Sequence, residues 1–443
     1  MSSELLQGRI ATLALVSGFL LACGSTNTGN PARPSAPEGI DVVTSGLARE
    51  TEPALEDVDL ARFGQTSVEF AFALYHECVG DLDSGDNALV SPVSVREALA
   101  MLFAGANGDT EVEMRSALGF LLPEPTLHAA FNATSLALAG RSNEFAGDGP
   151  SSGDLVLRLV NATFAQRGIS VKPEYLDILA VHYGSGVYLA DFANQAERER
   201  MVINSWVEER TENRIMGVLP EGSITSATSL VLVNAVYFKG SWLQAFDRAK
   251  TGEETFHALG GDVSVPTMNG RASMFAEGDG YKAVEIPYIT PAVRMLFIMP
   301  DEGRFDDFER RIDGTVLAGI RNELSPHLVQ LKVPRFRFES SFKLKPHMQA
   351  LGMVQAFEQG AADLSGIAGD RGSLYVAEIL HKTMVAVDED GTEAAAATVV
   401  LTPAPAASPP PAEFFFNRPG LFVVYDEPTS QILFMGRLMS PRG

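Results

Sequence analysis

The amino-acid sequence predicts an α+β fold in one large domain. Segments with helical periodicity lie mostly in the first half of the chain, whereas β-branched and aromatic runs of strand length lie mostly in the second half. The two kinds of segment do not alternate regularly, so a doubly wound parallel sheet is not expected. The chain has 443 residues, of which 46% are hydrophobic, and can therefore bury a sizeable core.

Residues 1–22 have the pattern of an export signal. Arg9 precedes an apolar run over residues 10–21, which is too short to span a membrane. The run ends in LLAC, which resembles the lipobox of bacterial lipoproteins and makes Cys23 a candidate lipidation site; an ordinary cleaved signal is the alternative. We therefore expect an exported protein: an outer-membrane lipoprotein, periplasmic or at the cell surface, or a secreted protein.

A flexible tether is expected over residues 23–56, because this segment is rich in Gly, Pro, Ser and Thr and lacks periodicity. The folded domain is then expected over residues 57–443. Helices are predicted at 68–79, 94–104, 110–118 and 198–212, and strands at 230–240, 292–300, 329–339, 383–390, 421–427 and 432–438. Several of these strands are apolar throughout, which indicates burial on both faces. Residues 140–154 have the composition of an exposed loop.

Patterns typical of catalysis or of nucleic-acid binding are absent from the sequence. The net charge of −22 argues against a nucleic-acid partner, because phosphate binding needs clustered Lys and Arg. We find no nucleophile elbow, no strand followed by GxGxxG and no HExxH motif. Cys78 alone remains once Cys23 is acylated or removed, so no intramolecular disulfide is expected. The expectation is a protein without enzyme activity, cofactor or metal.

A series of motifs between residues 63 and 441 resembles the serpin family of serine protease inhibitors. The motifs are NALVSPVSVREALAMLFAGANGDTEVEM, INSWVEERTENRIMGVLP, LVLVNAVYFKGSWLQAFD, LYVAEILHKTMVAVDEDGTEAAAAT and FNRPGLFVVYDEPTSQILFMGRL. Three positions depart from the family pattern: Asn213 stands where Gly is usual, Ala245 where Pro is customary and Gly420 where an aromatic residue is common. The resemblance implies helices packed on a large mixed sheet, two further sheets and an exposed reactive-centre loop at about 389–414.

The resemblance also implies a function, namely irreversible suicide-substrate inhibition of serine endopeptidases. A protease cleaves the exposed loop, is trapped as an acyl-enzyme, and residues 391–402 insert into the main sheet. The implied hinge comprises Glu389, Gly391, Thr392, Glu393, Ala394, Ala395, Ala396, Ala397 and Thr398. A non-inhibitory serpin that binds a partner and is cleaved only as a substrate is the alternative function.

The composition of residues 391–402 fits insertion. The segment has no proline, which a central strand excludes, and twelve residues at about 3.3 Å each span about 40 Å. Thr392, Ala394, Ala396, Thr398 and Val400 would share one face that carries no charge, whereas Glu393 would lie on the opposite face. An ordinary alanine-rich helix or linker is the alternative, and it leaves the uncharged face unexplained.

Two ways of counting place the cleaved bond at slightly different positions. Spacing from Glu389 puts the residue before the bond near Pro405, whereas spacing back from FNRP puts it near Ser408. Because most serine proteases refuse proline beside the bond, Ala406-Ala407 and Ala407-Ser408 are the better candidates. Small residues before the bond fit a shallow pocket, so the expected partner is an elastase-like or subtilisin-like protease in a covalent complex. Papain-like cysteine proteases are the alternative.

The resemblance assigns supporting positions to two regions of the main sheet. Ser91, Ser94, Asn234 and His381 match the shutter, a hydrogen-bond cluster beneath the point where the sheet opens, and Trp242 matches the breach aromatic residue. Arg335 matches a basic residue that pairs with Glu389. Plain core packing, or a surface ion pair worth at most about 1 kcal/mol, is the alternative for each. We expect a monomer that contacts a membrane only through the N-terminal lipid.

Overall fold

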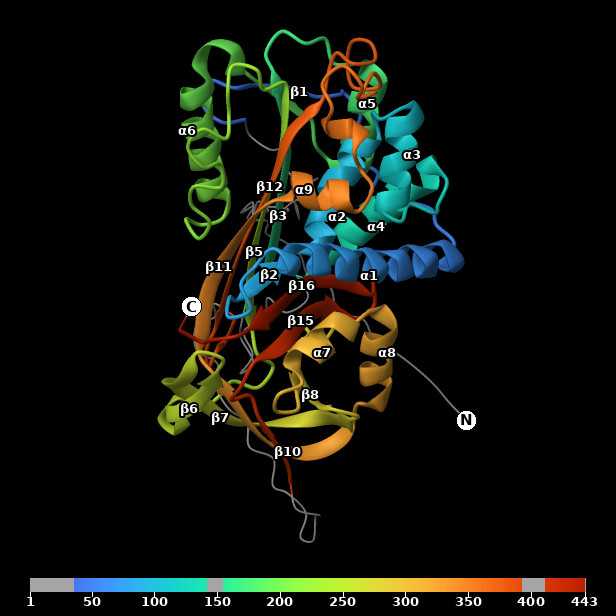
Figure 1. The fold of residues 1–443 in the computed structure, drawn as a ribbon. Coiled ribbons are helices and arrows are strands. Elements are labelled where there is room, and N and C mark those ends of the chain that lie inside the picture. Colours follow the sequence, from blue (N-terminus) through green and yellow to red (C-terminus); the bar gives the residue numbers. More distant parts are fainter. Residues whose placement is uncertain (1–35, 142–153, 393–410, 443) are drawn as a thin grey trace, which may run out of the picture. The chain divides into compact units, whose positions relative to one another are not determined.

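The computed structural model describes residues 36–141, 154–392 and 411–442 (Figure 1). Its helices are α1 (Asp57–Gly80), α2 (Pro92–Phe103), α3 (Gly108–Ala117), α4 (Glu124–Arg141), α5 (Pro173–Ile178), α6 (Phe192–Arg210), α7 (Phe305–Arg311), α8 (Gly314–Glu323) and α9 (Leu344–Ala350). Short helical turns are η1 (Leu179–Tyr183), η2 (Arg248–Lys250) and η3 (Gln355–Phe357). In the described ranges, no helix is long and apolar enough to cross a membrane.

The main sheet has seven strands and mixed orientation. In spatial order they are β1 (Asp41–Val43), β4 (Val187–Ala190), β3 (Leu155–Gln166), β5 (Leu230–Ser241), β13 (Gly391–Thr392), β12 (Val376–Val387) and β11 (Phe336–Lys343). β3 runs antiparallel to β5, and β12 runs parallel to β5 and antiparallel to β11. The predicted α+β class is therefore confirmed.

The second sheet has nine strands. Eight follow the order β14 (Ala412–Phe415), β10 (Ser325–Pro334), β7 (Gly261–Gly278), β8 (Tyr281–Pro287), β9 (Val293–Pro300), β15 (Gly420–Asp426), β16 (Gln431–Leu438) and β2 (Ala88–Val90), and β6 (Gly252–Ala258) pairs with β7. The first part of β7 pairs with β6, the following part pairs with β10, and its end pairs with β8. The two further sheets implied by the family resemblance are thus joined through β7.

Most predicted elements lie where the periodicity placed them, and two differences are informative. The predicted strand 329–339 divides into β10 and β11, because the chain leaves the second sheet at Pro334 and enters the main sheet at Phe336. The loop predicted at 140–154 begins later, since α4 extends to Arg141; residues 142–153 lie outside the described part.

Residues 36–56 correct the predicted tether. β1 forms an antiparallel pair with β4 at the edge of the main sheet. Further along, the Glu50 N–H donates to the Val181 carbonyl at 2.9 Å, and the Asn132 amide donates to the Glu50 carbonyl at 2.7 Å. An exposed sheet edge offers unpaired backbone groups to any extended segment, so polar composition did not prevent docking. The remainder of the expected tether, with Cys23, and the expected signal at 1–22 lie outside the described residues.

The main sheet is covered on both faces. Figure 1 shows α6 on one side of β3 and β5, and α2 and α4 on the other side. The side chains of β5 alternate accordingly: Val231, Val233 and Ala235 join the cluster under α6, whereas Val236 and Phe238 join the cluster shared with the second sheet. The continuous apolar sequence of β5 therefore has the predicted cause, which is burial on both faces.

Candidate functional site

The main sheet is parted at one end, between β5 and β12. These two parallel strands pair directly from Val376, opposite Leu230, to Thr383, opposite Val236. Beyond that point β13 lies between them, antiparallel to both. The first residues of the predicted inserting segment, Gly391 and Thr392, are thus already a strand of the sheet.

Only glycine fits at position 391 of β13, because any side chain there would collide with the backbone of β5. A Cβ atom built on it would lie 2.0 Å from the Gly240 carbonyl oxygen and 2.8 Å from the Ser241 Cα. Its φ of +155° is also rare for residues with a side chain. The requirement at Gly391 is therefore close backbone approach between two strands.

Thr392 is held inside the sheet by an aromatic pair. Its side chain is buried, and its hydroxyl shares a hydrogen bond of 2.8 Å with the Tyr288 hydroxyl. The Trp242 ring stacks on Tyr288 with centroids 4.6 Å apart, and its Nε1 donates to the Asp388 carbonyl at 3.0 Å. Trp242, the predicted breach residue, therefore contacts the chain immediately before β13 and supports the ring that Thr392 touches.

The Glu389 carboxylate is fully buried beside the parted end of the sheet. Arg335 donates to its Oε1 from Nε at 2.9 Å and also from Nη2, and the Thr251 hydroxyl donates to the same oxygen. Arg248 places a guanidinium nitrogen 4.0 Å from the other oxygen. Burial acts to raise the pKa of Glu389, but the hydrogen bonds from Arg335 and Thr251 prevail and leave it below its ordinary value.

Arg335 lies beside Glu389, as the family resemblance implied. Two other neighbours of Glu389 were not predicted, namely Arg248 in η2 and Thr251 directly after it. Neither residue stands in an apolar or motif-like context, so the sequence carries no signal for them.

His381 and Asn234 form the centre of the predicted shutter, on facing positions of β12 and β5. The Ser91 N–H donates to His381 Nε2 at 3.0 Å. Burial lowers the pKa of His381 to about 3, so the ring is neutral near pH 7. Because Nε2 accepts, Nδ1 carries the proton and donates to the Asn234 carboxamide oxygen. The Asn234 amide donates to the Ser94 hydroxyl.

Two details of this cluster were not predicted. Among the described residues the Ser91 hydroxyl has no hydrogen-bond partner, so Ser91 contributes its backbone only. Asn161 on β3, opposite Asn234, accepts hydrogen bonds from Asn234 and Ser94, and it donates to Glu97 Oε2 at 2.9 Å. Its role could have been suspected from the sequence, because an asparagine inside the apolar run LVLRLVNATFA needs a hydrogen-bond partner in the core.

The remaining predicted loop positions lie outside the described residues. These are Glu393, Ala394, Ala395, Ala396, Ala397 and Thr398 of the hinge, and Pro405, Ala406, Ala407 and Ser408 around the candidate bond. After the loop the chain re-enters at β14, which pairs in parallel with β10 of the second sheet.

The chain matches known proteins over most of its length. Residues 65–441 match the family model described as Serpin (serine protease inhibitor). An uncharacterized serpin-like protein of Thermococcus kodakarensis is 36% identical over 376 residues, covering 84% of each chain. Leukocyte elastase inhibitor of Xenopus tropicalis is 31% identical over 381 residues, covering 84% of this chain and 97% of the relative. Human thyroxine-binding globulin superposes with a TM-score of 0.75 at 26% identity, covering 86% of this chain and 99% of that structure.

Proposed function

This chain belongs to the serpin family, most of whose members are protease inhibitors rather than enzymes, and on that premise we propose that it is an irreversible suicide-substrate inhibitor of serine endopeptidases. The single observation that carries the proposal is β13, a two-residue strand seated between β5 and β12 at the parted end of the main sheet. It supplies a starting point for insertion with the register already set.

In the proposed reaction the protease serine attacks a carbonyl of the loop and forms an acyl-enzyme ester. The peptide bond breaks, and the C-terminal fragment leaves as an amine. Thr392 pairs with Gly240 and Val387, so continuing the same register would bring Thr398 between Asn234 and His381. The inserting strand would then replace the direct pairing of β5 with β12 before water hydrolyses the ester.

The sheet offers a driving force for this exchange. Insertion replaces one parallel pairing, between β5 and β12, by two antiparallel ones, and each added backbone hydrogen bond contributes about 0.5–1.5 kcal/mol. The side-chain hydrogen bond that crosses from β12 to β5 at the shutter joins neutral groups, since His381 is uncharged near pH 7. Breaking it therefore leaves no unpaired charge in the core.

We propose an elastase-like or subtilisin-like target and cleavage at Ala406-Ala407 or Ala407-Ser408. The small side chains at these positions support the proposal, as does the similarity to a leukocyte elastase inhibitor. We also propose export, with a lipid on Cys23, a monomeric state, and no membrane contact other than that lipid. Growth with labelled palmitate tests the lipid: label should enter the wild type but not Cys23→Ser.

The test of inhibition mixes the purified chain, from residue 24 onward, with pancreatic elastase and separately with subtilisin. Denaturing gels should show a band of serpin plus protease, and mass spectrometry of the released peptide should place the cut within residues 404–409. Cleaved serpin without that band, beside fully active protease, would contradict inhibition.

That second outcome would favour a non-inhibitory binding protein. Two observations support this alternative: the proline-rich stretch at 403–411, and similarity to thyroxine-binding globulin and ovalbumin, which are non-inhibitory serpins. In that case the loop is an ordinary substrate, and the partner is recognised elsewhere on the molecule.

A further inference from the structure

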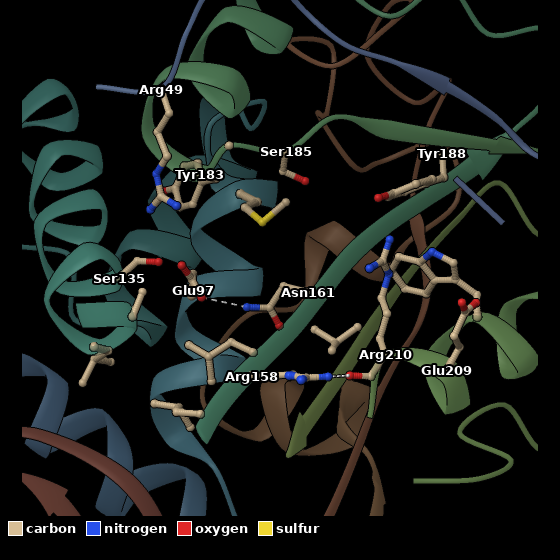
Figure 2. A pocket seen from close by; sticks show the side chains of 18 residues that line it. Arg49, Glu97, Ser135, Arg158, Asn161, Tyr183, Ser185, Tyr188, Glu209 and Arg210 are labelled. Carbon is tan, nitrogen blue, oxygen red and sulfur yellow. Dashed lines mark hydrogen bonds between the residues drawn. The ribbon is translucent and has the colours of Figure 1, made fainter. Parts of the chain in front are cut away.

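A cavity of about 590 Å³ lies beside β3 of the main sheet. Its walls come from α2, α4, β3, α6 and the N-terminal segment that carries Arg49 (Figure 2). This volume lies in the range of pockets that hold small organic ligands. None of the steps proposed above for inhibition uses it.

Several hydrogen-bond donors border the cavity. Arg49 is fixed by the hydrogen bond of 2.8 Å from its Nε to Asn132 Oδ1. Its Nη2 is buried and has no hydrogen-bond partner among the described residues. The Tyr188 hydroxyl and the Ser185 hydroxyl border the same space, as Figure 2 shows. A buried guanidinium nitrogen without an acceptor is costly, and a carboxylate oxygen is the acceptor that matches it best.

The arginines that line the cavity outnumber its acidic residues: Arg49, Arg158 and Arg210 against Glu97 and Glu209. Burial raises the pKa of Glu97, although Arg49 and hydrogen bonds from Ser135 and Asn161 act in the opposite direction. Glu209 is exposed at the rim. A cationic ligand would instead face Arg49 from within the same space, so the charge distribution favours an anion.

Apolar side chains line another part of the cavity. Met101, Leu138, Leu157 and Leu159 line the cavity together with the Trp206 ring and the Tyr188 ring. These side chains can cover a hydrocarbon or aromatic body while the acid group reaches Arg49. We propose that this cavity binds a small organic acid, with its carboxylate on Arg49 and its apolar body against Trp206 and the leucines.

The cavity also shares a residue with the shutter, and this part of the inference rests on the proposed function. Asn161 lines the cavity and accepts hydrogen bonds from Ser94 and Asn234. Insertion of a strand beside Asn234 changes the surroundings of Asn161. Ligand binding and loop insertion are therefore linked, and by reciprocity the affinity for the acid differs between the uncleaved and the loop-cleaved protein.

The first experiment titrates the full exported chain with 4-phenylbutanoate in a calorimeter. Its uncharged amide and 4-phenylbutylamine, which have the same body without the negative charge, serve as matched probes. The acid should bind with one site per chain and at least about tenfold more tightly than either probe, because a charge-assisted hydrogen bond is lost in both. No saturable binding of the acid, or equal binding of all three, would overturn the proposal.

Location is tested by fluorescence and by substitution. The chain has two tryptophans, so the acid should alter the emission of the wild type but not that of Trp206→Phe. Arg49→Gln should weaken binding about tenfold or more, and Arg49→Lys should restore part of it.

Arg167→Gln is the matched control, because Arg167 also holds the N-terminal segment, through the Gly39 carbonyl at 2.9 Å, but does not line the cavity. Equal effects of Arg49→Gln and Arg167→Gln would contradict the site. The link to insertion is then measured separately, as the ratio of affinities before and after loop cleavage. A ratio of one would overturn the link and leave the site intact.

Discussion

The parted end of the main sheet and the shutter at its middle are held by different chemistry. At the parted end, called the breach, the buried Glu389 carboxylate is surrounded by Arg335, Thr251 and Arg248, and β13 separates β5 from β12. At the shutter, β5 and β12 pair directly, and the neutral side chains of Asn234 and His381 bond to each other.

This difference separates two tasks. Charged hydrogen bonds are strong and directional, so they can hold the start of the loop in a fixed register at the breach. Neutral hydrogen bonds can be broken and remade without leaving a charge in the core, which suits a place that an inserting strand must pass. The four predictions that follow test this division of roles, from the largest expected effect to the smallest.

Thr392→Arg should abolish inhibition at the breach. The Thr392 side chain is 1% exposed and faces Tyr288, so an arginine there would be buried without a partner or would expel β13 from the sheet. The stoichiometry of inhibition, measured by titrating elastase activity, should rise at least about tenfold, with cleaved serpin as the product. The control is Thr255→Arg on the exposed side of β6, which should inhibit normally. Normal inhibition by Thr392→Arg would contradict the proposal that β13 is the starting point of loop insertion.

Arg335→Gln should destabilise the uncleaved protein. It removes two hydrogen bonds to the buried Glu389 carboxylate, and hydrogen bonds to charged groups contribute about 1.5–3 kcal/mol each. Because the Arg335 side chain is 39% exposed, solvent weakens both bonds, and the free energy of unfolding in urea should fall by about 2–3 kcal/mol. Arg337→Gln, an exposed position two residues along β11, should change it by less than about 0.5 kcal/mol. Equal effects of the two substitutions would show that Arg335 is only a surface residue.

His381 should make stability depend on pH. Its folded pKa of about 3 lies below the ordinary value of 6.5, so between these values the unfolded chain binds a proton that the folded protein does not. The free energy of unfolding should therefore fall by about 1.4 kcal/mol for each pH unit below about 6.5. Glu389, whose pKa is lowered, adds a loss of the same sign at more acidic pH.

Urea unfolding at several pH values measures this slope. His381→Gln should flatten it between about pH 6.5 and 4.5, whereas His257→Gln, at an exposed histidine with 55% of its side chain accessible, should leave it unchanged. An unchanged slope in His381→Gln would mean that the shutter histidine is not the buried neutral group described above.

Ser94→Ala and Ser91→Ala should separate a side-chain role from a backbone role. The Ser94 hydroxyl bonds to Asn234 and Asn161, so its loss should cost about 1 kcal/mol. The Ser91 hydroxyl has no partner among the described residues, so its loss should cost less than about 0.5 kcal/mol. Chemical denaturation measures both. The reverse order would contradict the hydrogen-bond assignment of the shutter.

The sequence was informative where local chemistry constrains it. The fold class and the central strands followed from apolar patterning, and the meeting of Arg335 with Glu389 followed from the family resemblance. The Gly391 contact with Gly240, the Arg248 contact with Glu389 and the docking of β1 did not, because each depends on chain segments that only the folded topology brings together. Asn161 could be predicted in part: a polar residue in a buried strand indicates that a hydrogen-bond partner exists, but not which residue it is.

The most direct test of the central claim, that the parted sheet accepts the loop as a strand, is thermal unfolding of the chain before and after loop cleavage. About ten inserted residues at about 1 kcal/mol each should raise the unfolding temperature by about 10 °C or more. Cleaved Thr392→Arg should show little of this increase. If the cleaved and uncleaved wild-type proteins unfold at the same temperature, the loop does not insert and the account is contradicted.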